Sequence, residues 1–172
     1  QRQNFNITIH AGEAFGKESI WQAIQYCGAH RIGHATRLLE DVVVDDNGEV
    51  ISLGELAQYV LDKRLPLEIC LLSNVHTGAI DKLENHPFSI FYKKKFRVFL
   101  NTDDRIMSDT TLTKEYVTAV ETFGITIDDV EKLNINAMKS AFLPYEERLK
   151  YIYEVIKPGY QKIKEKLLSL QA

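Results

Sequence analysis

Four short apolar segments recur along the chain at comparable spacing, and three of them are rich in β-branched residues. Three of the four lack a regular alternation of polar and apolar positions, which is typical of strands buried on both faces. The shortest segment is predicted as a strand from its place in the series. The four predicted strands are Phe5 to Ile9, Arg31 to Gly33, Leu67 to Leu72 and Phe96 to Leu100.

Apolar residues at helical spacing occupy intervals between these strands. The pattern predicts a helix over Lys17 to Gly28, with the glycine as its C-terminal stop. A second predicted helix spans Ser52 to Asp62. Ser52 is its expected N-cap, and Glu55 three residues on completes the pattern of a capping box.

The part of the chain after the fourth strand is predicted to be helical. Two helices are expected over Thr113 to Thr122 and Asp128 to Phe142. The amphipathic stretch from Tyr145 to Leu170 is interrupted at Lys157-Pro158-Gly159, which predicts two helices there. Their high charge predicts that they pack outside the core.

Strand and helix alternate at roughly thirty residues per unit, the rhythm of a parallel α/β fold. A full eight-stranded (β/α)8 TIM-type barrel needs about 250 residues. The 172 residues are therefore expected to form a single domain that supplies about four βα units over 1–144, with peripheral helices over 145–172. The chain begins without an initiator Met, so we expect it to start within a longer protein.

Composition excludes several classes of function. The net charge of −3 does not favour binding to nucleic acid, and the basic run Lys93 to Lys95 is expected to be a solvated loop. No apolar run approaches the ~20 residues of a membrane span. Cys27 and Cys70 lie in apolar contexts and are expected to be reduced core residues, which favours the cytoplasm.

Each predicted strand is followed by polar residues that suit metal-dependent hydrolysis. Active residues of a barrel of this kind lie at the C-terminal ends of its strands. Imidazole and carboxylate groups are ligands that suit a catalytic zinc, and a spare carboxylate beside them can move protons. The residues concerned are His10 and Glu13 after the first strand, His34 after the second, Ser73 and Asn74 after the third, and Asp103 and Asp104 after the fourth.

Each of these residues also has a structural interpretation. His10 can be a core histidine, and Glu13 can favour the positive end of the following helix dipole. His34 can hydrogen-bond a loop. Asp103 and Asp104 can act as an N-cap pair, but two adjacent buried carboxylates repel each other unless a cation or a donor compensates, which favours a metal and a substrate.

The remaining polar candidates are less specific. Ser73 and Asn74 suit the shaping of a loop as well as contact with a ligand. His30 and His34 are four residues apart, but the Glu of a His-Glu-x-x-His zinc motif is missing. Structural or solvent-exposed roles are expected for His76 and His86.

Four motifs in order resemble the adenosine deaminase family. They are His-Ala-Gly-Glu at 10–13, Arg-Ile-Gly-His at 31–34, Ser-Asn-x-x-Thr-Gly-Ala at 73–79 and Leu-Asn-Thr-Asp-Asp at 100–104. Their order and spacing are similar to the C-terminal half of that family's barrel, strands five to eight with the trailing helices. The resemblance covers nearly all of the chain.

The resemblance implies a zinc-dependent barrel that hydrolyses the 6-amino group of adenosine, or of 2'-deoxyadenosine, to give inosine and ammonia. By motif, His10 and Asp103 would be zinc ligands, and Glu13 would protonate the purine N1. His34 would orient or deprotonate the attacking water. Asp104 would hydrogen-bond the purine N7, and Gly12, Ser73 and Asn74 would complete the substrate site.

The chain also departs from the family. The His-x-His pair of the first strand, which supplies two further zinc ligands, has no counterpart here, so the N-terminal half of the barrel is an expected partner. Arg105 stands where the family often has Pro. A related purine or aminofutalosine-type deaminase, or a non-catalytic half-barrel that binds a partner, remains an alternative.

Overall fold

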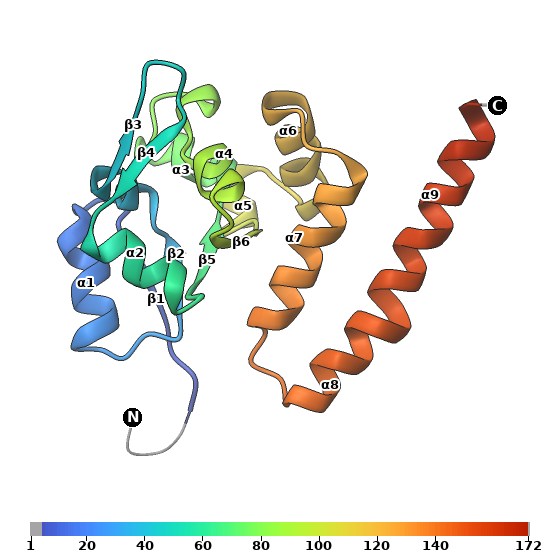
Figure 1. Cartoon of the computed structure of the whole chain (residues 1–172), viewed down its shortest axis with the longest axis horizontal. Helices are drawn as coiled ribbons and strands as arrows, with labels where there is room; N and C mark the ends of the chain where they lie inside the picture. The colour runs from blue at the N-terminus through green and yellow to red at the C-terminus, as the bar shows by residue number, and fades with distance from the viewer. Residues whose placement is uncertain (1–4, 172) are drawn as a thin grey trace.

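A four-stranded parallel sheet lies at the centre of the computed structural model, which describes residues 5–171. Its strands stand in the order β1 (Thr8–Ala11), β2 (Arg31–His34), β5 (Pro66–Ile69) and β6 (Arg97–Leu100). All three pairings are parallel, so the four carboxyl ends meet at one edge of the sheet (Figure 1). The predicted parallel α/β architecture is confirmed.

Register brings the predicted site residues of the first two strands together. His10 is the pairing partner of Gly33, and Ala11 is the partner of His34. On the other side of the sheet, Ile69 of β5 pairs with Leu100 of β6. The residues that follow each strand therefore leave the sheet from neighbouring positions.

Helices pack along the sheet and bury its apolar side chains. Helix α1 packs on β1, and helices α4, α6 and α7 pack on β6. The helical segments before the C-terminal region are α1 (Lys17–Gln25), η1 (Thr36–Asp41), α2 (Glu55–Asp62), α3 (Leu71–His76), η2 (Leu83–Asn85), α4 (Phe88–Lys93), α5 (Arg105–Ser108), α6 (Leu112–Phe123) and α7 (Ile127–Ser140). The largest fully buried apolar side chains are Phe88, Phe91, Ile20, Ile32, Leu38, Leu67, Ile69, Leu71 and Leu133.

Two of the predicted strands differ from the structure by more than one residue at an end. The first begins at Thr8, where pairing with Arg31 starts, and Phe5 outside it is 59% exposed. The third ends at Ile69, and its apolar run continues into helix α3 with Leu71 fully buried. An apolar run alone does not distinguish a buried strand from the first turn of a buried helix.

The predicted capping box at Ser52 is wrong. Ser52 pairs with Val43 in a hairpin of β3 (Val42–Val44) and β4 (Val50–Leu53), and the N-cap of α2 is Gly54. The carboxylate of Asp41 accepts a hydrogen bond from the N–H of Ala57 at 2.9 Å, so a distant residue replaces the local cap. Helix α1 ends at Gln25, before Gly28, whose φ is +67°.

The C-terminal region is helical from Tyr145 to Gln171 and packs on α7 through η3 (Tyr151–Ile156) and α9 (Lys157–Gln171) (Figure 1). It comprises α8 (Tyr145–Lys150), the π-helical η3 and α9. The break predicted at Lys157-Pro158-Gly159 is therefore absent. Pro158 is the second residue of α9 and follows directly on the π-helical η3, so the hydrogen bond that a proline removes falls at the junction where the helical hydrogen-bonding pattern changes.

The expectations about the cysteines and about membrane-spanning helices can be compared with the structure. Cys70 is buried, as predicted, but Cys27 is exposed, because α1 ends two residues before it. Within residues 5–171, no helix has the length and apolar character that crossing a membrane requires.

Candidate metal and proton-transfer site

His10 lies at the carboxyl end of β1, with its ring against the backbone of Gly33. A β-carbon added at Gly33 would stand 2.6 Å from His10 Cδ2, closer than side-chain carbons approach one another. The glycine next to His34 in the sequence therefore makes room for the imidazole of the neighbouring strand. Gly12, with a φ of +67°, turns the chain from β1 toward α1 and packs against Ile20.

His34 reaches the same cluster through an unusual backbone conformation. Successive residues of a strand point to opposite faces, so strict alternation would place His34 on the face opposite His10 and Gly33. Its φ of +68° departs from strand geometry and redirects the side chain. A left-handed non-glycine residue costs of order 1–3 kcal/mol and is frequent at functional sites. Asp103, with a φ of +54°, has the same feature.

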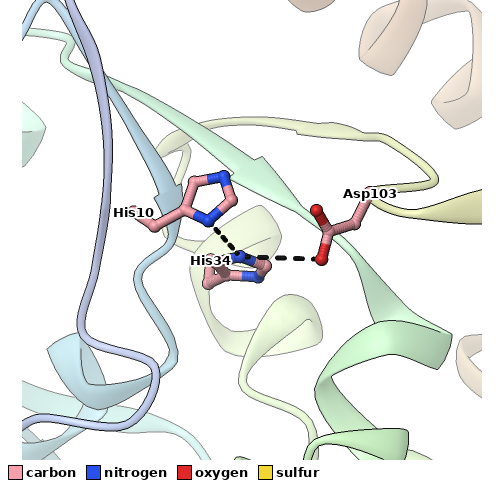
Figure 2. Close-up of side chains that lie close together, drawn as sticks. All are labelled: His10, His34 and Asp103. Carbon is pink, nitrogen blue, oxygen red and sulfur yellow. Dashed lines mark hydrogen bonds and ion pairs between the residues drawn. The ribbon is translucent and has the colours of Figure 1, made fainter. Parts of the chain in front are cut away.

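His10, His34 and Asp103 each offer a ligand atom, and these atoms lie within 4.8 Å of one another. Figure 2 shows His34 between the other two side chains. Its Nε2 is 3.3 Å from His10 Nδ1 and 3.9 Å from Asp103 Oδ2. Two ring nitrogens and a carboxylate oxygen are a donor set that suits zinc.

Glu13 approaches this cluster from the β1–α1 loop. Its Oε2 is 3.5 Å from His34 Nε2, and its Oε1 accepts a hydrogen bond from the hydroxyl of Thr77 at 3.1 Å. The Glu13 side chain is 22% exposed, so it touches both the cluster and solvent. A carboxylate in this position can exchange a proton with a small molecule bound beside the cluster.

A second layer of hydrogen bonds holds the cluster from behind. The Ser73 hydroxyl donates to Asp103 Oδ2 at 2.7 Å, and the Asn74 amide nitrogen lies 2.9 Å from His34 Nδ1. Asn74 Oδ1 lies 3.1 Å from Nε2 of His86. Ser73, Asn74 and His86 are all buried. Helix α3, which follows β5, thus supplies the two polar residues expected from the third motif.

Burial controls the protonation of the two inner histidines. It lowers the pKa of His34, although the neighbouring Glu13 carboxylate acts in the opposite direction. Burial and the nearby His34 lower the pKa of His86 to about 3. Both imidazoles are therefore neutral near pH 7, which is the form that can exchange protons or bind a metal.

A cavity of about 580 Å³ opens beside the cluster along the β1 edge of the described sheet. His10, Gly12, Glu13 and Phe15 are among the residues that line it. Its volume lies within the usual range of small-molecule pockets. The site therefore has room for a small ligand next to the imidazoles and carboxylates.

Asp104 lies apart from the cluster. It is exposed, so the premise of two adjacent buried carboxylates is wrong. Its side chain accepts a hydrogen bond from the N–H of Met107 at 3.4 Å and caps α5. Arg105 is exposed in the first turn of the same helix.

Sequence reasoning missed two buried contributors to the site. His86 was expected to be structural or solvent-exposed, and its link to Asn74 depends on a contact across twelve residues that no local pattern encodes. Glu115 is fully buried on α6 and accepts hydrogen bonds from Thr110 and from the N–H of Leu72 at the start of α3. Thr77, in contrast, stands within the third motif, so its position was available.

Comparison with known proteins gives consistent results. The sequence profile described as adenosine deaminase matches residues 1–158. Adenosine deaminase 1 of Streptomyces coelicolor is 51% identical over 171 residues, which cover 99% of this chain and 43% of that protein. The N6-methyl-AMP deaminase of Arabidopsis thaliana superposes with a TM-score of 0.72 at 27% identity, over 96% of this chain and 43% of its own.

A third relative is informative about the fold alone, because its sequence identity is low. A Burkholderia ambifaria amidohydrolase, solved with bound Zn, superposes with a TM-score of 0.82 at 16% identity and covers 98% of this chain and 44% of its own. The chain therefore has part of the barrel-like amidohydrolase fold. It spans less than half the length of each of these relatives.

Proposed function

Because the chain belongs to the adenosine deaminase family, we propose that it supplies the C-terminal half of a deaminase barrel. Strands β1, β2, β5 and β6 would be strands five to eight, formed within residues 1–144, and residues 145–172 would be the outer helices. The parallel order of the four strands and the 43% coverage of the Streptomyces relative support this assignment. The N-terminal half of the barrel would be the partner of this chain.

The proposed reaction is the hydrolytic deamination of adenosine or 2'-deoxyadenosine to inosine and ammonia. The observation that carries the proposal is the convergence of His10, His34 and Asp103 within 4.8 Å, with Glu13 Oε2 3.5 Å from His34 Nε2. Four residues from three strand ends and one loop meet at one point, and the 580 Å³ cavity is lined by two of them, His10 and Glu13.

Zinc fits this group of residues, and His10 and Asp103 are the proposed ligands. A bound zinc ion lowers the pKa of water toward ~7, which makes a nucleophile available at neutral pH. Two protein ligands fall short of the three that are usual in a catalytic zinc site. The proposal therefore requires further ligands from outside this chain.

Proton transfer is assigned to Glu13, and orientation of the water to His34. Addition of water to C6 of the purine breaks the aromatic stabilisation of the ring, so a proton must reach N1 as the attack proceeds. Glu13 lines the cavity and is placed to donate that proton. His34 lies 3.5 Å from Glu13 and 3.3 Å from His10, so it would orient the attacking water.

Binding of the purine is assigned to residues around the cavity. Gly12 lines it and lets the backbone come close to a ligand. Asp104 would donate a hydrogen bond to purine N7, which is an acceptor. Ser73 and Asn74 would act through the neighbours they hold, Asp103 and His34.

A chimera tests the proposed function. The segment of the Streptomyces coelicolor enzyme that aligns with this chain would be replaced by this chain, and adenosine conversion would be followed by its ultraviolet absorbance change, with and without added zinc. We expect deamination that depends on zinc. Adenine, AMP and N6-methyl-AMP would be assayed in parallel, because a related enzyme acts on N6-methyl-AMP.

The outcomes separate the alternatives. If the chimera prefers another purine, the assignment as a deaminase stands and the proposed substrate changes. A folded chimera that binds zinc stoichiometrically yet deaminates none of these purines would overturn the proposal. The alternative of a non-catalytic half-barrel predicts that zinc is not bound at all.

A further inference from the structure

A chain of buried hydrogen bonds leads from a backbone amide to His34. The N–H of Phe88 donates to His86 Nδ1 at 3.1 Å. Nε2 of His86 lies 3.1 Å from Asn74 Oδ1, and the Asn74 amide nitrogen lies 2.9 Å from His34 Nδ1. The donor at the start of this chain is unambiguous because a backbone nitrogen always carries its hydrogen.

Each link fixes the next. His86 Nδ1 accepts from Phe88, so the proton of the neutral His86 ring is on Nε2, and that proton goes to Asn74 Oδ1. The orientation of the amide is then set, and its NH₂ group donates to His34 Nδ1. His34 Nδ1 must therefore carry a lone pair, which leaves the ring proton on Nε2.

The surroundings of His34 Nε2 independently favour the same tautomer. On that side lie Glu13 Oε2 at 3.5 Å and Asp103 Oδ2 at 3.9 Å, beside His10 Nδ1 at 3.3 Å. The carboxylate oxygens are acceptors, whereas Nδ1 of a neutral His10 ring can take either role. A proton on His34 Nε2 is attracted by both carboxylates, whereas a lone pair there would be repelled by them.

We propose that Asn74 and His86 are positioning residues that hold His34 as the Nε2–H tautomer, so that His34 presents a hydrogen-bond donor to the attacking water and is not a resident metal ligand. A ring nitrogen that carries a proton has no lone pair for a metal. Of the three residues that converge, His10 and Asp103 then remain as ligands. The catalytic meaning of this assignment rests on the proposed function, but the tautomer itself does not.

The test is a long-range ¹H–¹⁵N correlation spectrum of this chain, labelled with ¹⁵N at histidine and free of metal, recorded at a pH at which the rings are neutral. This spectrum shows which ring nitrogen of each histidine carries the proton. Single His→Gln variants at the other histidines assign the signals. We expect the Nε2–H pattern for both His34 and His86. A dominant Nδ1–H pattern at His34 in the unmodified chain would overturn the proposal.

Asn74→Asp is the sharpest variant because it keeps the shape of the side chain and removes the NH₂ donor. A carboxylate at position 74 accepts from both neighbours, so His34 should change to the Nδ1–H tautomer or become doubly protonated, while His86 keeps its proton on Nε2. Asn47→Asp, in the exposed turn of the hairpin, is the matched control and should leave both histidines unchanged. An Asn74→Asp chain that folds and keeps His34 in the Nε2–H form would also overturn the proposal.

His86→Phe provides a second variant that does not introduce a charge. Without the Nε2–H donor the Asn74 amide can turn over, so we expect the population of the Nε2–H tautomer at His34 to fall, and His86→Gln to restore it. An unchanged population in His86→Phe would contradict the role of His86. If the spectra agree with the proposal but the chimera is inactive, the proposed function fails while the positioning role stands.

Discussion

Charged side chains at the two ends of the central sheet are compensated to different degrees. At the amino end of β2, Arg31 Nε pairs with Glu68 Oε2 at 3.0 Å, its Nη1 donates to the carbonyl of Ser140 at 3.2 Å, and its guanidinium lies 4.4 Å from the ring centre of Phe142. At the carboxyl end, His10, Glu13 and Asp103 surround a single imidazole.

The difference lies in which groups the protein itself compensates. The charge of Arg31 meets an opposite charge and an aromatic face, so the arrangement is complete without a ligand. The two carboxylates at the other end accept hydrogen bonds from the hydroxyls of Ser73 and Thr77 and flank one neutral imidazole, and His34 and Asp103 hold left-handed backbone conformations. Uncompensated like charges and local strain are the features that a cation and a substrate can offset.

The largest expected effect is at Glu13. In the chimera, Glu13→Gln should lower kcat/KM for adenosine by about 10²–10⁴-fold, the usual contribution of a general acid or base, because the amide cannot give up a proton. Zinc content should not change. Glu84→Gln, on the exposed η2 segment, is the control. Turnover of Glu13→Gln within a few-fold of the parent would remove this residue from the proton transfer.

Metal binding should depend on His10 and much less on a histidine outside the cluster. In the chimera, His10→Asn should weaken zinc binding by more than the 10–100-fold typical of groups behind the ligands, because it removes a ligand itself. His76→Asn, at the exposed end of α3, should leave the affinity unchanged. Competition with a chromophoric chelator measures both, and equal affinities would place the metal elsewhere.

The opposite end of the sheet should respond in stability alone. Arg31→Met removes the charged partner of the half-buried Glu68 carboxylate, which keeps a hydrogen bond from the Asn101 amide, so the free energy of unfolding should fall by about 1–3 kcal/mol. Urea unfolding of this chain measures the change. Zinc affinity of the corresponding chimera should not change, and a large loss of affinity would show that the two ends are coupled.

The smallest expected effect, taken per pH unit, is the pH dependence of stability that His86 contributes. The folded-state pKa is lowered to about 3, whereas the unfolded value is about 6.5. Between these values the unfolded chain binds more protons, so stability falls as the pH drops through this window, by at most about 1.4 kcal/mol per pH unit from this group.

Urea unfolding of this chain and of His86→Gln, at several pH values between about 4 and 7, isolates that contribution. The variant should lose less stability per pH unit than the parent. Burial also lowers the pKa of His34, so the variant should keep part of the slope. Identical slopes would mean that His86 is not the buried neutral group described above.

Sequence patterns predicted the architecture well because it depends on local apolar periodicity. Strands β1, β5 and β6 and helices α1, α2, α6 and α7 follow from that periodicity, with shifts of a few residues at their ends. The short strand β2 was inferred from its place in the series, and α3, α4 and α5 were not predicted. The errors share a physical cause. Asp41 caps α2 in place of Ser52, and Pro158 is tolerated because it falls at the junction with a π-helical segment. Both depend on neighbours that a local window does not contain.

The residues of the candidate site were largely predictable from the sequence, but the hydrogen bonds that connect them were not. Strand ends identified His10, His34 and Asp103, which the register of the sheet brings together. The distant contact between His86 and Asn74 has no signature in a single sequence. Asp104 shows the converse case, because adjacent aspartates suggested a buried pair and the second of them is exposed.

Anomalous X-ray diffraction at the zinc absorption edge, from crystals of the zinc-loaded chimera, tests the central claim most directly. The claim is that the carboxyl end of this sheet holds a deaminase metal site. We predict one strong peak within bonding distance of a His10 ring nitrogen and an Asp103 oxygen, with His34 Nε2 outside bonding distance. A fully occupied zinc ion that contacts neither His10 nor Asp103 would contradict the account.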